Sequence, residues 1–456
     1  MTSSIDIYLC LGYLLAWIIT FIWYHIKRFA LDAGSVIIGM QIIYAIFSVL
    51  TLTDELFSMA FEELHFFPYL YLYSMMMIAI GPIIYDHIHP TFKIAQPHTR
   101  ILSILSIIII ATALIQIPDI VHNASTGVLA LLTDTDAGKN AYDEQVEAVA
   151  ESGKAIRNLP AIIYNALSDL IPFILFYFLT TRKKNHILIT GLLVSVFIGL
   201  MLAVSRGQRG GIIISFLTAV GAYFLFRRYI SRKINILIQG IGITCILLIT
   251  VPVIAITISR FGKKAAGVGG YVNWYIGQGS IYFNNYGLDA GGTRNGERTF
   301  NLVKRLFDSN TPKNFVERRE KYSHLKIDDY FFTTFVGDFT IDFGPYIPVA
   351  IFLTFSYVLL KGIRPREGEY QLHQVLLLYF AVCISLQGGM TLFSYSDSGN
   401  LRIVMFGLLY GYLRYHKSLL ERYPLLNKTS LLGDRDDSRK SLPHLDRIKE
   451  DETNNS

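Results

Sequence analysis

The sequence is short of charge. Only 17% of its 456 residues are Asp, Glu, Lys or Arg, whereas 52% are hydrophobic. A soluble globular chain typically carries about a quarter charged residues. Hydrocarbon tolerates few unpaired charges, so this shortage argues against a soluble domain and for a membrane protein.

Cysteine and cofactor-binding motifs are scarce too. Cys10, Cys245 and Cys383 lie in separate apolar runs, so they form neither a disulfide framework nor a metal-ligand cluster. The sequence contains no P-loop, no dinucleotide-binding glycine fingerprint and no HExxH motif. We therefore expect neither a metal ion nor a cofactor. The first residues, MTSSID, lack the basic segment of a cleavable secretion signal, so we expect the first apolar run to be retained as a helix.

Apolar runs repeatedly reach the length that an α-helix needs to cross a bilayer, roughly 20 residues. The sequence thus predicts an all-α, polytopic integral membrane protein with about eleven transmembrane helices. The predicted spans are 7–24, 33–52, 67–85, 101–118, 160–180, 186–204, 211–226, 235–258, 344–360, 373–393 and 401–415.

Alternate short loops are basic, and such loops lie in the cytoplasm. These loops are 25–32, 86–100, 181–185, 227–234 and 361–372. The N-terminus is then outside and the C-terminus inside. We expect a transmembrane domain over 1–415 with outer loops 119–159 and 259–343, followed by a polar cytoplasmic tail, 416–456, that is disordered.

Arginines at the outer ends of spans are candidates for binding an anion. Arg206 and Arg209 are three residues apart in the hairpin Ser205-Arg206-Gly207-Gln208-Arg209-Gly210-Gly211, so on a continuing helix they share a face. Glycines let the backbone approach a ligand closely, and the guanidinium fork suits phosphate oxygens. Arg260 and Arg402 lie at the same outer level. The alternative is that these arginines snorkel to lipid headgroups.

The long outer loop adds weaker candidates. Its basic residues include Arg294 and Arg298, and a basic outer surface suggests an anionic partner, although an ordinary solvated surface explains it equally well. His324 is a candidate base, but a lone loop histidine is a weak signal.

Three carboxylates also stand out. Asp169 lies inside the span 160–180, where a carboxylate is costly and is either functional or paired with an arginine. Asp338 and Asp342 are four apart and share a face if their segment is helical. They are candidates for a base and its orienting group, or for pairing with the arginines.

The layout of spans and loops, the outer arginine hairpin and the run Gly337-Asp338 to Asp342-Phe343-Gly344 together resemble the Wzy-type O-antigen and capsule repeat-unit polymerases of bacteria. The resemblance extends loosely over 1–415. It implies a membrane glycosyltransferase of the bacterial inner membrane with its active site facing the periplasm. It also implies partners: undecaprenyl-pyrophosphate-linked oligosaccharide, the lipid bilayer, and a chain-length regulator and a flippase, but no nucleic acid.

The implied reaction moves a growing glycan from undecaprenyl pyrophosphate to a sugar hydroxyl of a new lipid-linked repeat unit. Under this hypothesis Arg206, Arg209, Arg260, Asp338 and Asp342 are catalytic. The substrate-binding residues would be Arg294, Arg298, Arg402, Asp169 and His324. An O-antigen ligase has a similar layout. A lipid-linked oligosaccharide flippase is a third possibility, but its charges should line a central cavity rather than gather at one face.

Reporter fusions test the predicted orientation. A reporter at Ser125, in the outer loop 119–159, and one at Lys183, in the basic loop 181–185, should lie on opposite sides of the membrane. Alkaline phosphatase activity at Ser125 and its absence at Lys183 is the expected result. The same side for both fusions would contradict the orientation.

Overall fold

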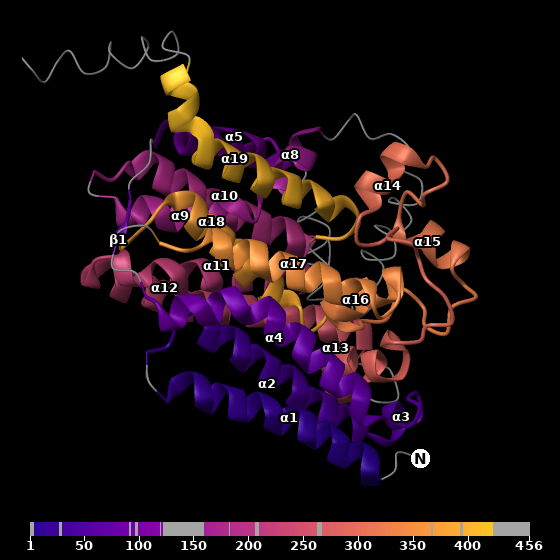
Figure 1. Cartoon of the computed structure of the whole chain (residues 1–456). Helices are drawn as coiled ribbons and strands as arrows, with labels where there is room; N and C mark the ends of the chain where they lie inside the picture. The colour runs from indigo at the N-terminus through magenta and orange to yellow at the C-terminus, as the bar shows by residue number, and fades with distance from the viewer. Residues whose placement is uncertain are drawn as a thin grey trace, which may run out of the picture.

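Apolar helices form the body of the molecule (Figure 1). The structure, a computed structural model, describes residues 4–26, 30–90, 93–95, 99–118, 120–121, 159–181, 183–205, 209–261, 267–365, 368–392 and 395–422. Nearly all of the predicted loop 119–159 and most of the predicted tail lie outside these ranges.

Every predicted span falls on a helix or on a bent pair of helices. The helices are α1 (Ser4–His25), α2 (Ala33–Leu52), α4 (Phe66–Ile88), α5 (Thr99–Leu114), α8 (Leu159–Leu167), α9 (Leu170–Thr180), α10 (His186–Ser205), α11 (Arg209–Phe226), α12 (Arg232–Phe261), α17 (Ile347–Gly362), α18 (Leu372–Gln387) and α19 (Asn400–Arg422). Local signals mark some starts: the Asp32 side chain caps α2 and exchanges hydrogen bonds with Ser35.

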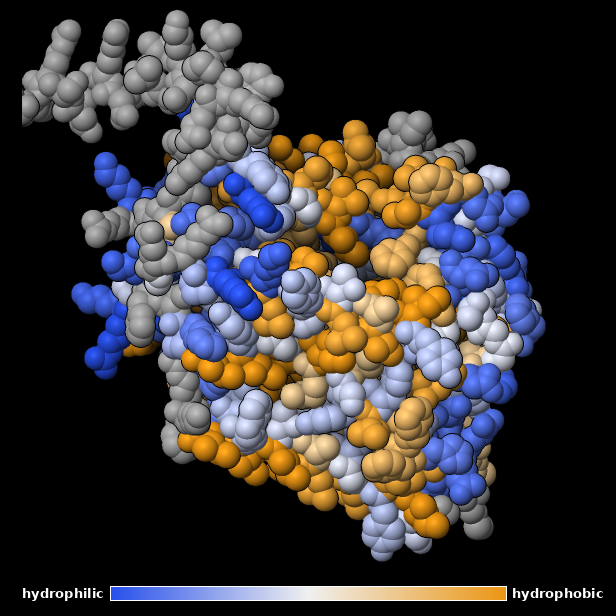
Figure 2. All heavy atoms as spheres, viewed as in Figure 1, coloured by the Kyte–Doolittle hydropathy of each residue, from blue (hydrophilic) through white to orange (hydrophobic). Residues whose placement is uncertain are grey.

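An all-α membrane protein is confirmed, whereas the count of eleven spans remains a prediction. Among the described residues five helices are long and apolar enough to cross a membrane, and α8 with α9, bent by 57°, makes a sixth. The helices α5, α17 and α18 are apolar but shorter. Figure 2 shows hydrophobic surface over the helices, between hydrophilic residues at the two ends of the bundle.

The predicted inner loops gather at one end of the bundle. There β1 (Lys93–Ile94) pairs in parallel with β2 (Glu369–Tyr370), and Arg228 forms an ion pair of 3.0 Å with Asp86. The N-terminus, α3 (Glu55–Ser58) and the polar segments of the long loop lie at the other end (Figure 1). This grouping is what alternate crossings require. The compartment on each side remains a prediction.

The long loop 259–343 is itself largely structured. It contains α13 (Gly267–Tyr282), η3 (Phe283–Gly287), α14 (Asn301–Phe307), α15 (Phe315–Lys321) and α16 (Thr334–Phe343). We call residues 288–343, together with the short helix η4 (Asp397–Gly399), the polar lobe. By contrast α13 packs lengthwise against α2, so part of this loop belongs to the bundle.

Small residues make the contact between α13 and α2 possible. A Cβ on Gly277 would lie 2.3 Å from the carbonyl carbon of Phe47. Non-bonded carbon atoms do not approach each other this closely. The Ser48 hydroxyl donates to the Gly277 carbonyl at 2.6 Å and lies 2.8 Å from the Ser280 hydroxyl. Close backbone approach with hydroxyl bonds is typical of helix contacts in membranes.

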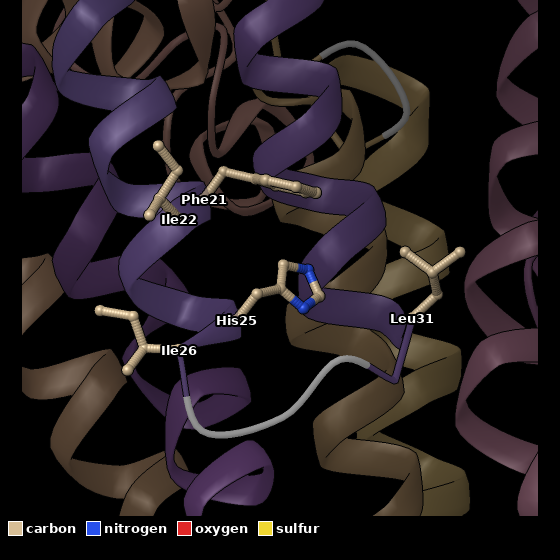
Figure 3. Close-up of a pocket in the computed structure, with 5 residues that line it drawn as sticks. All are labelled: Phe21, Ile22, His25, Ile26 and Leu31. Carbon is tan, nitrogen blue, oxygen red and sulfur yellow. The ribbon is translucent and has the colours of Figure 1, made fainter.

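An apolar groove lies at the basic end of α1, away from the polar lobe. It has a volume of about 420 Å³ and is lined by Phe21, Ile22, His25, Ile26 and Leu31 (Figure 3). Its aliphatic and aromatic lining offers little to a charged substrate.

The glycine contact gives a matched pair of variants within α13. Gly277→Ala should destabilise the protein by about 1–3 kcal/mol, because the added methyl group meets the α2 backbone. Gly269→Ala is the control, since nothing lies within 4 Å of its added Cβ. Thermal unfolding in detergent compares them. Equal midpoints would contradict the close packing of α13 on α2.

Candidate functional site

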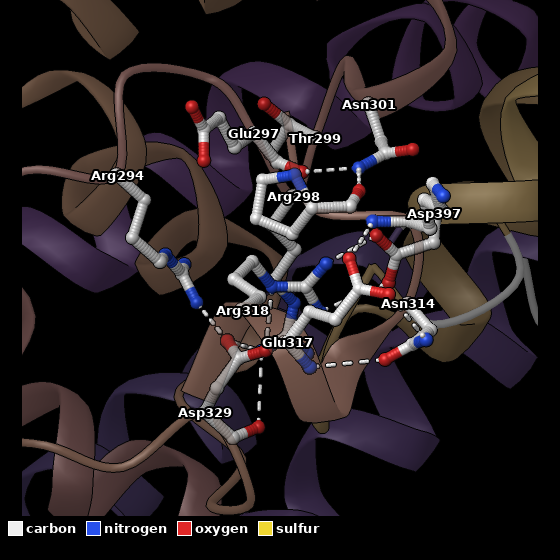
Figure 4. Close-up of polar contacts among 12 residues, drawn as sticks. Arg294, Glu297, Arg298, Thr299, Asn301, Asn314, Glu317, Arg318, Asp329 and Asp397 are labelled. Carbon is white, nitrogen blue, oxygen red and sulfur yellow. Dashed lines mark hydrogen bonds and ion pairs between the residues drawn. The ribbon is translucent and has the colours of Figure 1, made fainter. Parts of the chain in front are cut away.

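The polar lobe contains a buried network of charged side chains. Its members come from five segments: the loop before α14, helix α15, the loop after α15, helix α16 and the short helix η4. They are Arg294, Arg298, Arg318, Asp329, Asp338, Asp342 and Asp397. We call this set the ion network. Figure 4 shows the three arginines with Asp329 and Asp397.

Asp329 lies at its centre. Its carboxylate forms ion pairs with Arg294, with Arg298 at 2.6 Å and with Arg318 at 2.6 Å. Burial opposes ionisation of Asp329, but the three guanidinium groups outweigh it and hold the pKa of this carboxyl well below its usual range. Asp329 is therefore ionised throughout the physiological pH range.

The two aspartates of α16 face the same network. Asp342 pairs with the Arg294 Nε at 2.8 Å, and its other oxygen accepts from the Thr299 amide and hydroxyl at 2.7 and 2.8 Å. Asp338 pairs with the Arg298 Nε at 3.2 Å. Both carboxylates are fully buried. Their four-residue spacing did predict a shared face, and the contacts favour pairing with arginine over a free catalytic base.

Asp338 also ties α16 to the segment before α19. Its second oxygen accepts from the Thr391 hydroxyl and the Leu392 amide, both at 2.6 Å. Further along the chain, the Arg318 guanidinium donates two hydrogen bonds to the carboxylate of Asp397. The ion network thus holds residues 391, 392 and 397.

The guanidinium groups of Arg294 and Arg298 are enclosed inside the protein by carboxylates and other acceptors. The two residues are 3% and 6% exposed. Burial disfavours the charged form of Arg298, but Asp329, Asp338 and Asp397 more than compensate and raise its pKa. In this arrangement three guanidinium groups face four carboxylates, so the network offers an anion no surplus of positive charge.

Strained backbone borders the network. Among the described residues the non-glycine residues with positive φ are Asn295, Thr334 and Asp397, at 52°, 67° and 51°. A β-branched residue such as Thr334 rarely adopts this conformation, and such strain costs roughly 1–3 kcal/mol. Strain of this kind persists where the surroundings hold it in place, and it concentrates at functional sites.

A second pair of predicted residues meets at the bend between α8 and α9. Asp169 is 5% exposed and accepts from Arg402 at 3.1 Å, while Arg402 also donates to the Asn165 carbonyl at 3.1 Å. The structure thus shows Asp169 paired with an arginine, which was one of the two roles that the sequence left open for it. Asn400, two residues before Arg402, donates to the Thr299 carbonyl at 2.9 Å, which links this pair to the ion network.

The remaining candidates lie elsewhere. Arg206 is outside the described residues, and so are the side chains of Arg209 and Arg260, although their backbones belong to α11 and α12. His324 is exposed and lies beside the Tyr322 ring. Among the described residues, no group of three or more His, Cys, Asp or Glu side chains is placed to hold a metal ion.

Sequence reasoning did not single out Arg318, Asp329 or Asp397. Asp397 lies in the polar run Ser394-Tyr395-Ser396-Asp397-Ser398 between two predicted spans. This run is the feature of the sequence that could have identified Asp397 as a candidate. Arg318 and Asp329 stand among other charged residues of the loop, and nothing local distinguishes them from solvated neighbours.

Two adjacent aspartates test the importance of the network. Asp329→Asn leaves three buried guanidinium groups without their shared partner and should destabilise the protein by about 3–5 kcal/mol. Asp328→Asn is the control: Asp328 is 38% exposed and pairs with the 40% exposed Arg319, so its loss should cost at most about 1 kcal/mol. Thermal unfolding and limited proteolysis of the lobe measure the difference. Similar losses in both would contradict a central role for Asp329.

The comparisons with known proteins bear on the bundle rather than on the polar lobe. No curated protein and no solved structure matches the chain. One family model does match, over a stretch that contains Asp169, the arginine hairpin and Arg260 and that ends before the ion network. Residues 86–269 match the family described as O-antigen polysaccharide polymerase Wzy, which confirms the resemblance to that family over this part of a multi-pass membrane protein.

Proposed function

We propose that this protein polymerises lipid-linked oligosaccharide repeat units into O-antigen or a related capsular or exopolysaccharide. The observation that carries the proposal is the family match over residues 86–269. The proposed location is the bacterial inner membrane, with the reaction at the periplasmic face. A chain-length regulator and a flippase are the proposed protein partners.

The proposed reaction is a block transfer of glycan. The bond between the anomeric carbon of the donor glycan and the pyrophosphate oxygen breaks, and a bond forms from that carbon to the acceptor sugar hydroxyl. The hydroxyl proton is released, and undecaprenyl pyrophosphate leaves with the bonding electron pair. Charge develops on the leaving pyrophosphate, so prearranged cationic donors accelerate the step most.

Arg206, Arg209 and Arg260 are the proposed pyrophosphate ligands. They lie within the matched stretch, at the ends of α10, α11 and α12 that the sequence predicts to be periplasmic. Arg294 and Arg298 are bound by carboxylates in the ion network, whereas no acidic residue stands within the hairpin 205–211. The hairpin arginines are thus better suited than the network arginines to meet an incoming anion.

The ion network and the Asp169–Arg402 pair have a supporting part in this proposal. Asp338 and Asp342 hold Arg298 and Arg294, and the network holds residues 391, 392 and 397. These residues precede α19, which carries Arg402. Arg402 is 21% exposed at its side chain, so it is the member of this set best placed to contact substrate while Asp169 orients it. His324, on the lobe surface, is a candidate contact to the glycan.

Conservative substitutions in the hairpin test the site. Arg206→Lys and Arg209→Lys keep the charge but lose the planar fork that contacts phosphate at two points. Each should lose about 2–4 kcal/mol of transition-state stabilisation, or roughly a hundredfold or more in rate. Glycan chain length on gels, at matched membrane levels of protein, is the readout.

The control is Arg232→Lys, at the opposite end of α12, which should leave chain length unchanged. Normal chains in both hairpin variants would show that these arginines only snorkel and would remove the hairpin from the site. Deletion of the gene distinguishes the reaction from that of a ligase: single transferred repeat units indicate a missing polymerase, and the absence of every transferred repeat indicates a missing ligase.

A further inference from the structure

Helix α14 exposes large apolar side chains outside the predicted spans. Leu306 and Phe307 are 75% and 86% exposed, and Val303 and Phe300 are 49% and 37% exposed. Leaving such side chains in water is unfavourable, and the helix has only seven residues with which to hold them. An exposed apolar patch of this kind is typical of a surface that contacts another protein or a membrane.

These side chains form one stripe along α14. Val303, Leu306 and Phe307 are three and four residues apart on α14, so they share a face, and Phe300 directly precedes the helix. By helical spacing Lys304 borders the stripe and Arg305 lies on the opposite face of α14. An apolar stripe with basic residues beside and opposite it is the pattern of a helix that lies in the headgroup region of a bilayer.

The stripe continues into a membrane helix. The Phe300 ring contacts the Phe343 ring, with centroids 5.9 Å apart. Phe343 ends α16, and the next helix, α17, begins four residues later beside Tyr346, which is 86% exposed. Exposed aromatic residues at the start of an apolar helix mark the membrane–water boundary. Figure 2 shows hydrophobic surface where α14 adjoins the bundle, with hydrophilic residues beyond it.

We infer that α14 is an interfacial anchor: its stripe of Phe300, Val303, Leu306 and Phe307 lies in the outer leaflet, and Lys304 and Arg305 contact anionic headgroups. The partner is a lipid surface, chosen because the stripe is continuous with the lipid-facing start of α17 and because the basic residues of α14 complement phosphate.

The anchor has a consequence for the polar lobe. Helix α14 starts three residues after Arg298, and Asp342 binds the intervening Thr299. Insertion of α14 therefore fixes the height of the ion network at the membrane surface. If the proposed function holds, the pyrophosphate of the lipid-linked substrate lies at this same height. Helix α14 would then position the polar lobe next to the substrate.

A fluorescent probe on the stripe tests the anchor. In full-length protein with Cys245→Ala, Phe307→Cys carries an NBD label in phosphatidylglycerol–phosphatidylcholine vesicles. Cys10 and Cys383 are buried. Glu320→Cys, on the exposed face of α15, is the matched control. We expect blue-shifted emission at position 307, several-fold stronger quenching by spin-labelled lipid than at 320, and protection from aqueous iodide.

Two outcomes would overturn the inference. Iodide quenching at 307 equal to that at 320 would place α14 in water. Protection from both iodide and spin-labelled lipid would indicate a protein partner or a second copy of the chain. Because the readout needs no activity, it is independent of the proposed polymerase reaction. A paired change, Lys304→Gln with Arg305→Gln, should lower lipid quenching at 307 only in vesicles that contain phosphatidylglycerol.

Discussion

One buried carboxylate, that of Asp329, organises the polar lobe, because it draws three guanidinium groups to a single point. Each arginine then reaches a different element: Arg294 and Arg298 meet α16 through Asp342 and Asp338, and Arg318 meets η4 through Asp397. Isolated charges cannot be buried at acceptable cost, but charges that share partners can. The lobe is therefore held together by ions where it has little apolar core of its own. Among the described residues, the separate hydrophobic cluster here has five buried members, and one of them, Tyr282, belongs to α13.

This arrangement divides the arginines by their task. Those of the ion network are enclosed by carboxylates, and Arg318 binds Asp397, while Asp338 binds residues 391 and 392. Arg402 stands at the border, paired with Asp169 and partly exposed. The hairpin arginines belong to the stretch that matches the polymerase family. Charge that is committed to buried ion pairs gives rigidity.

Different parts of the long loop 259–343 have surfaces of opposite character. On the bundle side, α13 approaches α2 through Gly277 and hydroxyl groups, as helices do where lipid removes the hydrophobic drive for packing. On the other side of the lobe, α14 turns an apolar stripe outward. A segment that hydropathy treats as one long outer loop thus contains a helix of the bundle, a charged core and a surface suited to lipid.

The sequence by itself determined the class of protein and the position of most helices of the bundle, but it left α13 inside a predicted loop. Both follow from runs of apolar residues, which are a local property read directly along the chain. The sequence also determined that Asp338 and Asp342 share a face, because helical spacing relates residues four apart. Only the tertiary structure decided the partners of these residues. Arg318 and Asp397 are 79 positions apart and Arg294 and Asp329 are 35 apart, and no periodicity links residues at such separations. Their pairing depends on how α15, α16 and η4 pack together, which is a property of the folded chain alone.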